Sequence, residues 1–199
     1  LKTPLFTIQS YILTLIDGGM DDPNILKKYL KRSSKAIDRL TYLVKDLDLI
    51  SQFESGVKSI EKEKFDILSI ISNVYELLEM ESKKNKISLE LDKNYLNPIF
   101  VMADKYRIQQ VITNLVMNSI KYGVENGTTE ISIQDLNKEK FIISVTDNGL
   151  GISKEHLPRL FERFYRVDKS GNRKKGGSGL GLSIVKHVIE AHNEKIFVE

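Results

Sequence analysis

The sequence predicts an α+β fold made of a helical hairpin followed by an α/β domain. In residues 1–56, apolar side chains recur every three or four positions on both sides of a glycine-containing break, as in paired helices. Beyond residue 56, short alternating segments typical of strands are mixed with helical segments, and a glycine-rich segment precedes the last helix. We therefore expect two domains, residues 1–56 and residues 57–199.

The hairpin is predicted from its break and its restart. The helical spacing of the first helix stops at Asp17-Gly18-Gly19. Asp22 and Pro23 then supply an N-cap and a proline at the first helical position, a favoured helix start. The second helix carries an apolar seam, with a flanking row every seven residues. The seam is Leu26, Leu30, Ser33, Ile37, Leu40, Val44 and Leu47, and the flanking row is Tyr29, Ala36, Leu43 and Ile50.

This widened seam is the pattern of a helix in a bundle, and two helices alone do not cover it. The simplest cover is a second copy of the chain, which would make a homodimeric four-helix bundle. The alternative is that the seam packs against the remainder of the same chain.

The elements of the second domain are predicted from caps and alternation. Asp66 caps a helix to about Lys84, and Asp104 caps another to about Tyr122. A last helix covers residues 180–191. Strands are predicted at residues 87–91, 99–102, 129–134 and 140–146, with a polar turn around Asn137 joining the last two, and a further strand starts within 195–199.

Composition excludes several classes of function. The net charge of +3, from 30 basic and 27 acidic residues, is too balanced to favour nucleic acid as a partner. The chain has no cysteine, which excludes disulfides, thiolate zinc sites and cysteine nucleophiles. No apolar run approaches the roughly 18 residues that a membrane-spanning helix needs.

Two asparagines and a lysine share one face of the predicted helix that ends near Tyr122. Asn114 and Asn118 are four residues apart, and Lys121 follows three residues later. A carboxamide oxygen suits Mg²⁺, and a lysine suits phosphate oxygens. The alternative, two asparagines facing solvent on an amphipathic helix, is equally compatible with this segment alone.

A second motif, Asp147-Asn148-Gly149-Leu150-Gly151-Ile152, directly follows a predicted strand. Asp-Asn-Gly usually marks a hairpin turn, but no alternating strand follows, and residues 153–155 are typical of a helix start. An aspartate at a strand end, beside two glycines, can accept hydrogen bonds from a ligand amine while the backbone comes close.

The third motif is the glycine-rich run of residues 176–183, which leads into a helix and so favours phosphate binding. It lacks the preceding strand of a Rossmann fingerprint and the Gly-Lys-Ser/Thr ending of a Walker loop. The intervening segment 161–166, Phe-Glu-Arg-Phe-Tyr-Arg, is either a lid hinge or a short amphipathic helix.

The order and spacing of these motifs, together with the opening Leu1-Lys2-Thr3-Pro4-Leu5, resemble the bacterial sensor histidine kinases of the HisKA subtype over essentially the whole chain. The resemblance implies a dimerisation and phosphotransfer hairpin, followed by an ATP-binding domain with the Bergerat fold, an α/β sandwich. The N, G1, F and G2 boxes of that family are all present in order.

The resemblance assigns a role to each motif. Asn118 would hold Mg²⁺, Asn114 would lie near the phosphates in a catalytic position, and Asp147 would accept from the adenine amino group of ATP. The lid would span residues 163–178, and Arg166 would reach the polyphosphate. The other implied ATP contacts are Lys121, Tyr122, Gly149, Gly151, Ile152, Phe164, Tyr165, Gly177, Ser178, Gly179, Leu180, Gly181 and Leu182.

The opening residues match the end of the family's H box, His-Glu-x-x-Thr-Pro. The phosphoacceptor histidine is then expected two positions before Leu1, and Thr3 would serve the reverse reaction, dephosphorylation of the regulator. None of the three histidines present lies on the hairpin. The implied partners are a second copy and the receiver domain of a response regulator. The implied location is the cytoplasm, with a membrane anchor in upstream parts of the protein.

Three rival functions are weighed against this one. A gyrase-like or Hsp90-like ATPase needs a glutamate base where this chain has Asn114, and a serine-directed anti-sigma kinase lacks the Thr3-Pro4 hairpin. A nucleotide-binding scaffold or degenerate kinase of the same fold stays open.

Two departures from the family affect the C-terminal end: Asn193 and Glu194 replace the usual Gly-Gly after His192, and the sequence ends before a further expected strand.

Overall fold

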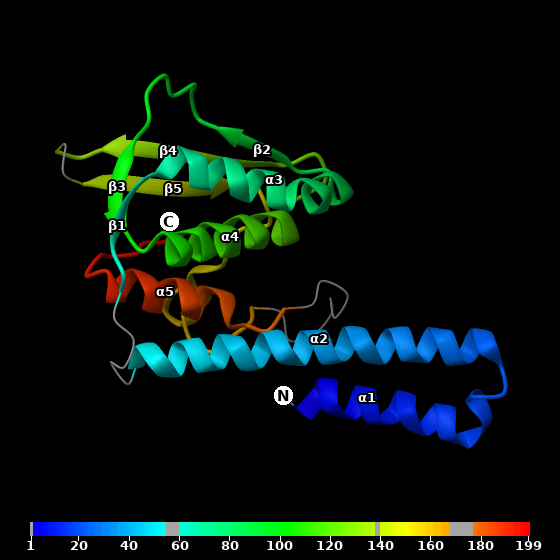
Figure 1. Ribbon diagram of the computed structural model, residues 1–199. Helices are drawn as coiled ribbons and strands as arrows, with labels where there is room; N and C mark the ends of the chain where they lie inside the picture. The colour runs from blue at the N-terminus through cyan, green and yellow to red at the C-terminus, as the bar shows by residue number, and fades with distance from the viewer. Residues whose placement is uncertain (1, 55–59, 138–139, 168–176) are drawn as a thin grey trace. The chain divides into compact units, whose positions relative to one another are not determined.

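The computed structural model describes residues 2–54, 60–137, 140–167 and 177–199, and its chain forms two compact units, residues 1–54 and 55–199 (Figure 1). The first unit is a pair of helices. The second combines helices with a two-stranded sheet and a three-stranded sheet. This is the predicted α+β class. The functional assignment of the two predicted domains stays a prediction.

The hairpin consists of α1 (Lys2–Thr14), a π-helical turn (Leu15–Gly19) and α2 (Pro23–Glu54). The chain reverses where Gly18 adopts a φ of 102°, at the break that the sequence predicts. Asp22 Oδ1 then accepts hydrogen bonds from the backbone N–H groups of Asn24 (2.8 Å) and Ile25 (3.4 Å), which confirms Asp22 as the cap of α2. Tyr11 and Tyr29 pack across the two helices with their ring centroids 5.3 Å apart.

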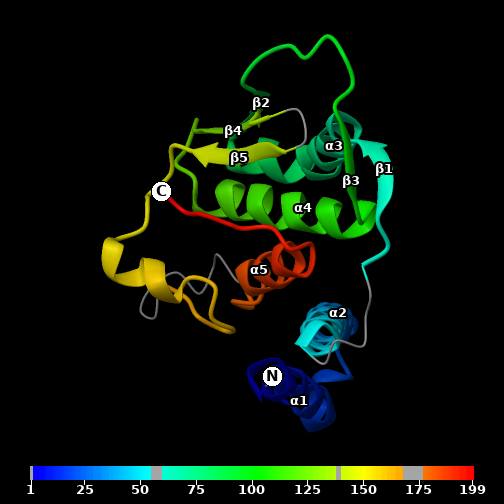
Figure 2. The ribbon, with the colours of Figure 1, turned by 90° about the vertical axis from the view of Figure 1, so that its left-hand side faces the viewer.

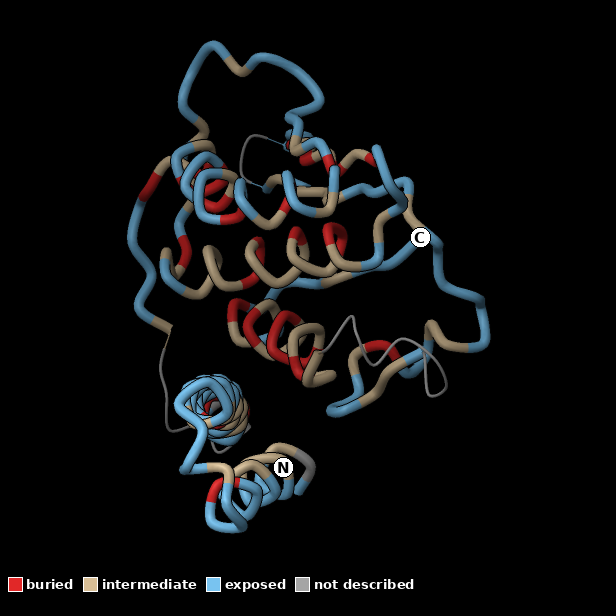
Figure 3. Tube along the Cα trace, turned by 90° about the vertical axis from the view of Figure 1, so that its right-hand side faces the viewer, coloured by how far each residue is buried: buried red, intermediate tan, exposed pale blue. Residues whose placement is uncertain are grey.

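The hairpin leaves much of its apolar surface uncovered. Figure 3 shows few buried positions along α1 and α2. The exposed large apolar residues of this unit include Leu5, Phe6, Ile12, Leu13, Ile16, Leu30, Ile37 and Val44. Three of these, Leu30, Ile37 and Val44, belong to the predicted seam. The seam is therefore left open at these three positions, although Ser33 within it is buried.

The second unit has two layers: the sheet β2-β4-β5 and a layer of helices. The strands of this sheet are β2 (Ser88–Leu91), β4 (Thr128–Asp135) and β5 (Phe141–Asp147), and the helices are α3 (Ile67–Asn85), α4 (Lys105–Tyr122) and α5 (Gly181–Ala191). Strand β2 pairs parallel to β4, and β4 pairs antiparallel to β5. Figures 1 and 2 show α4 lying between the sheet and α5.

The core of this unit lies between α3, α4 and the inner face of the sheet. The burial pattern of β4 alternates, with Thr129, Ile131 and Ile133 pointing inward. They meet fully buried side chains of α3 and α4, including Ile71, Val74 and Val116. Asp66 and Asp104 accept hydrogen bonds from the backbone of α3 and α4, so both predicted caps are confirmed.

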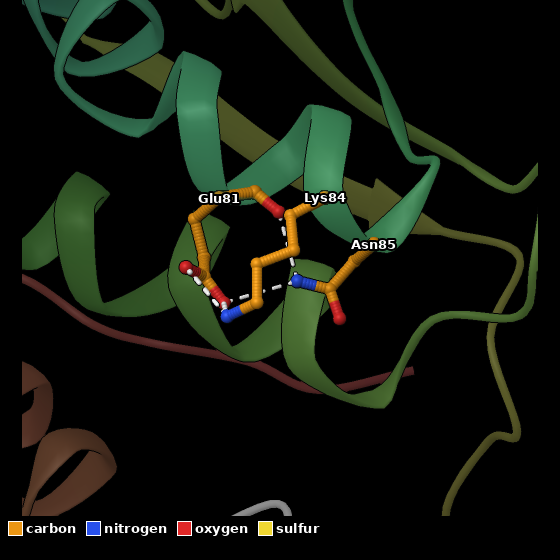
Figure 4. A network of polar contacts seen from close by, with 3 residues as sticks. All are labelled: Glu81, Lys84 and Asn85. Atoms are coloured by element: carbon orange, nitrogen blue, oxygen red, sulfur yellow. Dashed lines mark hydrogen bonds and ion pairs between the residues drawn. The ribbon is translucent and has the colours of Figure 1, made fainter.

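A polar network closes the end of α3 (Figure 4). Asn85 Nδ2 donates to the carbonyl of Glu81 (2.8 Å) and to its carboxylate (3.1 Å), and Lys84 Nζ lies 3.1 Å from the same carboxylate. Lys86 then turns the chain with a left-handed φ of 56°. Two tyrosine hydroxyls form hydrogen bonds at the β2 edge of the sheet. Tyr75 Oη donates to the carbonyl of Glu90 in β2, and Tyr95 Oη accepts from the backbone N–H of Ile133 in β4. Burial raises the pKa of Tyr75 to about 12, so its hydroxyl stays a donor.

Two predicted features need correction. The sequence did not indicate β1 (Glu63–Asp66), which pairs antiparallel with β3 (Phe100–Ala103), because only Phe65 in it is buried. The strand expected within residues 195–199 is wrong. Strand pairing among the described residues is confined to β1–β5, and this segment has no ladder partner.

The departure at Asn193 has a specific structural solution. Asn193, which follows the C-cap residue His192 of α5, adopts a left-handed φ of 61°. The backbone N–H of Glu194 donates to the carbonyl of Ile189 (3.1 Å), and that of Asn193 donates to Glu190 (2.9 Å), which is the Schellman pattern. His192 is buried, and its Nε2 accepts from the backbone N–H of Asp104 at 3.0 Å. Asparagine therefore ends α5 at the position where the resemblance implies glycine.

Candidate functional site

Helix α4 presents the two predicted asparagines on the face that does not enter the core. Val116 and Ile120 are buried on the opposite side, whereas Asn114 and Asn118 are half-buried. The carboxamide nitrogen of Asn114 is itself buried and has no hydrogen-bond partner. A buried, unpartnered donor costs free energy unless a ligand supplies an acceptor. Asn114 therefore points to a ligand on this face of α4.

Residues 177–181 of the glycine-rich run, called the glycine segment below, lie against this face of α4. A Cβ atom added to Gly177 would overlap Lys121 Nζ, and one added to Gly181 would lie 3.6 Å from Asn114 Oδ1. Lys121 Nζ also lies 5.1 Å from the centre of the Tyr122 ring. The structure thus brings the asparagine face and the glycine segment together, although they are about sixty residues apart in the sequence.

Phe164 and Gly179 form a second contact within the site. The backbone N–H of Phe164 donates to the Gly179 carbonyl at 2.9 Å, and both residues have left-handed φ angles, 62° and 73°. A Cβ atom on Gly179 would approach the Phe164 backbone to 2.8 Å. Such angles are uncommon outside glycine and concentrate at functional sites. Only glycine fits at position 179 without a shift of the neighbouring backbone.

Arg166 lies next to the same glycine segment. Its Nη1 donates to the Gly177 carbonyl at 3.4 Å, while its Nε is buried without a partner. Two donors, Asn114 Nδ2 and Arg166 Nε, are therefore buried and unpartnered around one glycine segment. An anion with several oxygens would satisfy both.

Side-chain contacts within the segment between Ile152 and Arg166 stabilise its conformation. The segment contains a short 3-10 helix, Lys154–Arg159, and then turns, so the amphipathic helix considered for residues 161–166 is not formed. His156 Nδ1 and Tyr165 Oη form a hydrogen bond of 2.7 Å. Arg159 lies over the Tyr165 ring and donates to Glu162 at 2.9 Å, which lowers the pKa of the Glu162 carboxyl.

Asp147 ends β5 and begins a tight turn. Its Oδ1 accepts from the backbone N–H of Gly149 at 2.9 Å, and its side chain is otherwise exposed. Gly149 lies close to the end of α4, because an added Cβ would be 2.9 Å from the Tyr122 carbonyl. Gly151 follows with a φ of 69°. The predicted carboxylate and glycines thus lie beside the C-terminal end of α4.

The remaining predicted site residues differ in their placement. Leu180 is fully buried, so its side chain belongs to the core, while Ser178 Oγ accepts from the backbone N–H of Leu180 at 3.2 Å. Leu182 is half-buried in the first turn of α5, and Ile152 is partly exposed. Thr3 lies on α1 in the other unit, and its side chain falls outside the described residues. Residues 168–176 of the predicted lid also lie outside them.

Sequence reasoning assigned no role to Asn148 or to a hydrogen bond between His156 and Tyr165, although the resemblance implied Tyr165 as an ATP contact. Both depend on contacts between segments. Asn148 lies within the predicted motif, and its side chain accepts a backbone hydrogen bond from the start of β4. The capacity of asparagine to accept from a nearby backbone N–H was the one local signal for it.

Comparisons with known proteins identify the family of this chain. Residues 103–199 match the family model described as histidine kinase-, DNA gyrase B- and HSP90-like ATPase. The sensor histidine kinase WalK of Bacillus subtilis (strain 168) is 35% identical over 202 residues, which cover 100% of this chain and 32% of that protein. The chain thus spans about a third of the length of this relative.

Solved histidine kinases have the same fold. The histidine kinase AdeS of Acinetobacter baumannii matches with a TM-score of 0.76 and 29% identity over 96% of this chain and 85% of that chain. The catalytic domain of histidine kinase ThkA is 35% identical, with a TM-score of 0.54, over 65% of this chain and 80% of that domain. ThkA in complex with the response regulator protein TrrA matches with a TM-score of 0.72 and 29% identity over 97% of this chain and 52% of that chain.

The fold is a helical hairpin followed by a domain that matches an ATPase family model over residues 103–199. The similarity to solved and curated kinases makes the family specific: the chain belongs to the sensor histidine kinases. Within the part of the chain that the structure describes, no helix combines the length and the apolar character that crossing a membrane requires.

The geometry at Gly179 predicts a selective loss of stability. Gly179→Ala is expected to lower the free energy of unfolding by about 1–2 kcal/mol, because alanine is strained at a left-handed φ. The matched control is Gly181→Ala in the first turn of α5. Its Cβ would make only an ordinary contact with Asn114, 3.6 Å from Oδ1, so this variant should leave stability unchanged or slightly raised. Urea unfolding of both variants measures the difference, and equal effects would contradict the geometry.

Proposed function

We propose that this chain is the catalytic core of a sensor histidine kinase, which binds ATP with Mg²⁺, phosphorylates a histidine and passes the phosphoryl group to an aspartate of a response regulator. The observation that carries the proposal is the glycine segment 177–181 lying against α4, with Asn114 Nδ2 and Arg166 Nε buried and unpartnered beside it. ATP supplies the transferable phosphoryl group, and Mg²⁺ offsets the charge of its phosphates.

Five groups of this chain would hold the phosphates. The glycine segment keeps its backbone close to α4, and the N-terminal end of α5 directs free N–H groups and a partial positive charge toward an anion. Lys121 and Arg166 add full positive charges. The donor Asn114 Nδ2 finds its acceptor there, and the carboxamide oxygen of Asn118 would hold Mg²⁺ one turn further along α4.

Asp147 would hold the base at the other end of the site. One of its oxygens is fixed by the Gly149 N–H at 2.9 Å, which leaves the other able to accept from the adenine amino group. Guanine presents a carbonyl oxygen at this position and would be repelled by the carboxylate. The site should therefore prefer ATP to GTP.

The hairpin would supply dimerisation and phosphotransfer. Its seam is open in the single chain, with Leu30 54% and Ile37 50% exposed, which favours a second copy as the cover. A homodimer should sediment at twice the chain mass of 22.8 kDa, and a monomer at micromolar concentration would contradict this part of the proposal.

A response regulator receiver domain is the proposed acceptor, because the matched kinase ThkA was solved with a response regulator protein. The acceptor histidine, the membrane anchor and the cytoplasmic location belong to the whole protein and rest on the family resemblance. The same holds for the phosphatase activity that would use Thr3.

The adenine assignment predicts the effect of Asp147→Asn. The variant should bind ATP at least tenfold more weakly, because a hydrogen bond to a charged acceptor contributes about 1.5–3 kcal/mol. Nucleotide titration by calorimetry measures the loss. An unchanged affinity for ATP would contradict the assignment of Asp147.

Phosphorylation is tested in a protein extended upstream to include the H-box histidine. Incubation with γ-labelled ATP should produce protein-bound label that is labile in acid and stable in base, as for a phosphohistidine. Nucleotide binding without label would favour the alternative of a nucleotide-binding scaffold. In the same protein, Thr3→Ala should slow dephosphorylation of the regulator, and a wild-type rate would contradict the role of Thr3.

A further inference from the structure

The side chain of Asn148 takes the place of a backbone group at the end of a sheet. Strands β4 and β5 pair in register as far as Thr129 opposite Asp147, so the next pair would be Thr128 opposite Asn148. No backbone rung forms there, because the chain turns after Asp147. Instead, Asn148 Oδ1 accepts the hydrogen bond from the backbone N–H of Thr128 at 2.8 Å.

This carboxamide lies where three segments meet. Gly127 is buried beneath it, and a Cβ on that residue would be 2.7 Å from Asn148 Oδ1. The carbonyl of Gly127 accepts from Ser88 at the start of β2, and its N–H donates to Val124 just after α4, each at 2.9 Å. Asn148 therefore joins the turn after β5 to the segment that links α4 with β2 and β4.

The side chains of Asp147 and Asn148 have different partners. Asp147 Oδ1 is bonded within its own turn to Gly149, and Asn148 Oδ1 is bonded across the sheet to Thr128. The turn itself lies on the end of α4, where Leu150 N–H approaches the Tyr122 carbonyl at 3.4 Å. The Asn148 bond is thus the side-chain link that fixes this turn to the neighbouring strand directly beside the Asp147 carboxylate.

We infer that Asn148 is a positioning residue for recognition of the adenine base. It does not contact the nucleotide. It extends the β4–β5 ladder by one side-chain bond and so holds the Asp147 carboxylate where it can accept from the amino group of the base. This inference rests on the proposed function, and within it on the role of Asp147. The specificity for the amino group should therefore depend on Asn148 as well as on Asp147.

The test compares two nucleotides on the whole chain. Purine riboside triphosphate has hydrogen in place of the adenine amino group and otherwise matches ATP. The wild-type chain should bind ATP about ten- to 150-fold more tightly than this analogue. Asn148→Ala should reduce that preference by about tenfold, through weaker ATP binding at nearly unchanged affinity for the analogue. Asn148→Asp retains an oxygen at the same position and should keep most of the preference.

The matched control lies at the opposite end of the same two strands. Asn137 Oδ1 accepts from the backbone N–H of Lys140 at 3.0 Å in the β4–β5 turn. Asn137→Ala removes the same type of bond and should leave the nucleotide preference unchanged. Circular dichroism and urea unfolding of each variant verify that it is folded before titration.

The outcomes separate the inference from the proposed function. If Asn148→Ala leaves the preference for ATP unchanged, including by weakening the binding of both nucleotides equally, the positioning role is overturned. The role of Asp147 would still stand if Asp147→Asn abolished the preference. A loss of preference in Asn148→Asp equal to that in Asn148→Ala would also overturn it, because the acceptor oxygen would then be irrelevant. If the wild-type chain shows no preference for ATP, the adenine assignment fails and this inference fails with it.

Discussion

Helix α4, which is held by apolar packing on two sides, carries the asparagines of the candidate site and contacts both the glycine segment and the turn after β5. The sheet and α3 bury Val116 and Ile120 on one side, and α5 packs on the other. This packing leaves Asn114, Asn118 and Lys121 on the remaining face, and it places the end of the helix beneath the turn that follows β5. Because protein interiors are close-packed, a shift of α4 would displace the phosphate side and the base side of the site together.

The site itself is locally unfavourable, and the surrounding fold stabilises it. Phe164 has a left-handed backbone, and two polar nitrogens are buried without partners. Each such feature costs on the order of 1–3 kcal/mol, and the apolar core compensates for it. A ligand that satisfied Asn114 and Arg166 would recover part of this cost on binding. Unpaired polar groups that lower the stability of the free protein would thus increase its affinity for a ligand that pairs with them.

Local features of the fold could be predicted from the sequence, whereas features made by contacts between distant segments could not. The caps Asp66 and Asp104 were predicted because a cap acts on residues two or three positions away. Strand β1 was missed because its partner β3 lies 37 residues further along and its own pattern is mostly polar. The motifs of the site were predicted by type. Their meeting against α4, and the role of Asn148, depend on the tertiary fold.

The parallel pairing of β2 with β4 has a consequence for the order in which the sheet assembles. Asp135 and Phe141 pair across 6 residues, whereas Ser88 and Thr128 pair across 40. Closing the longer loop costs about 1.7 kcal/mol more in chain entropy. Strand β2 should therefore dock late in folding, and it should open first in the native state. The backbone amides of β2 would then exchange with solvent deuterium faster than those of β4. The reverse order would show that the hydrogen bonds of the Tyr75 and Tyr95 hydroxyls stabilise this edge by more than the entropy of loop closure destabilises it.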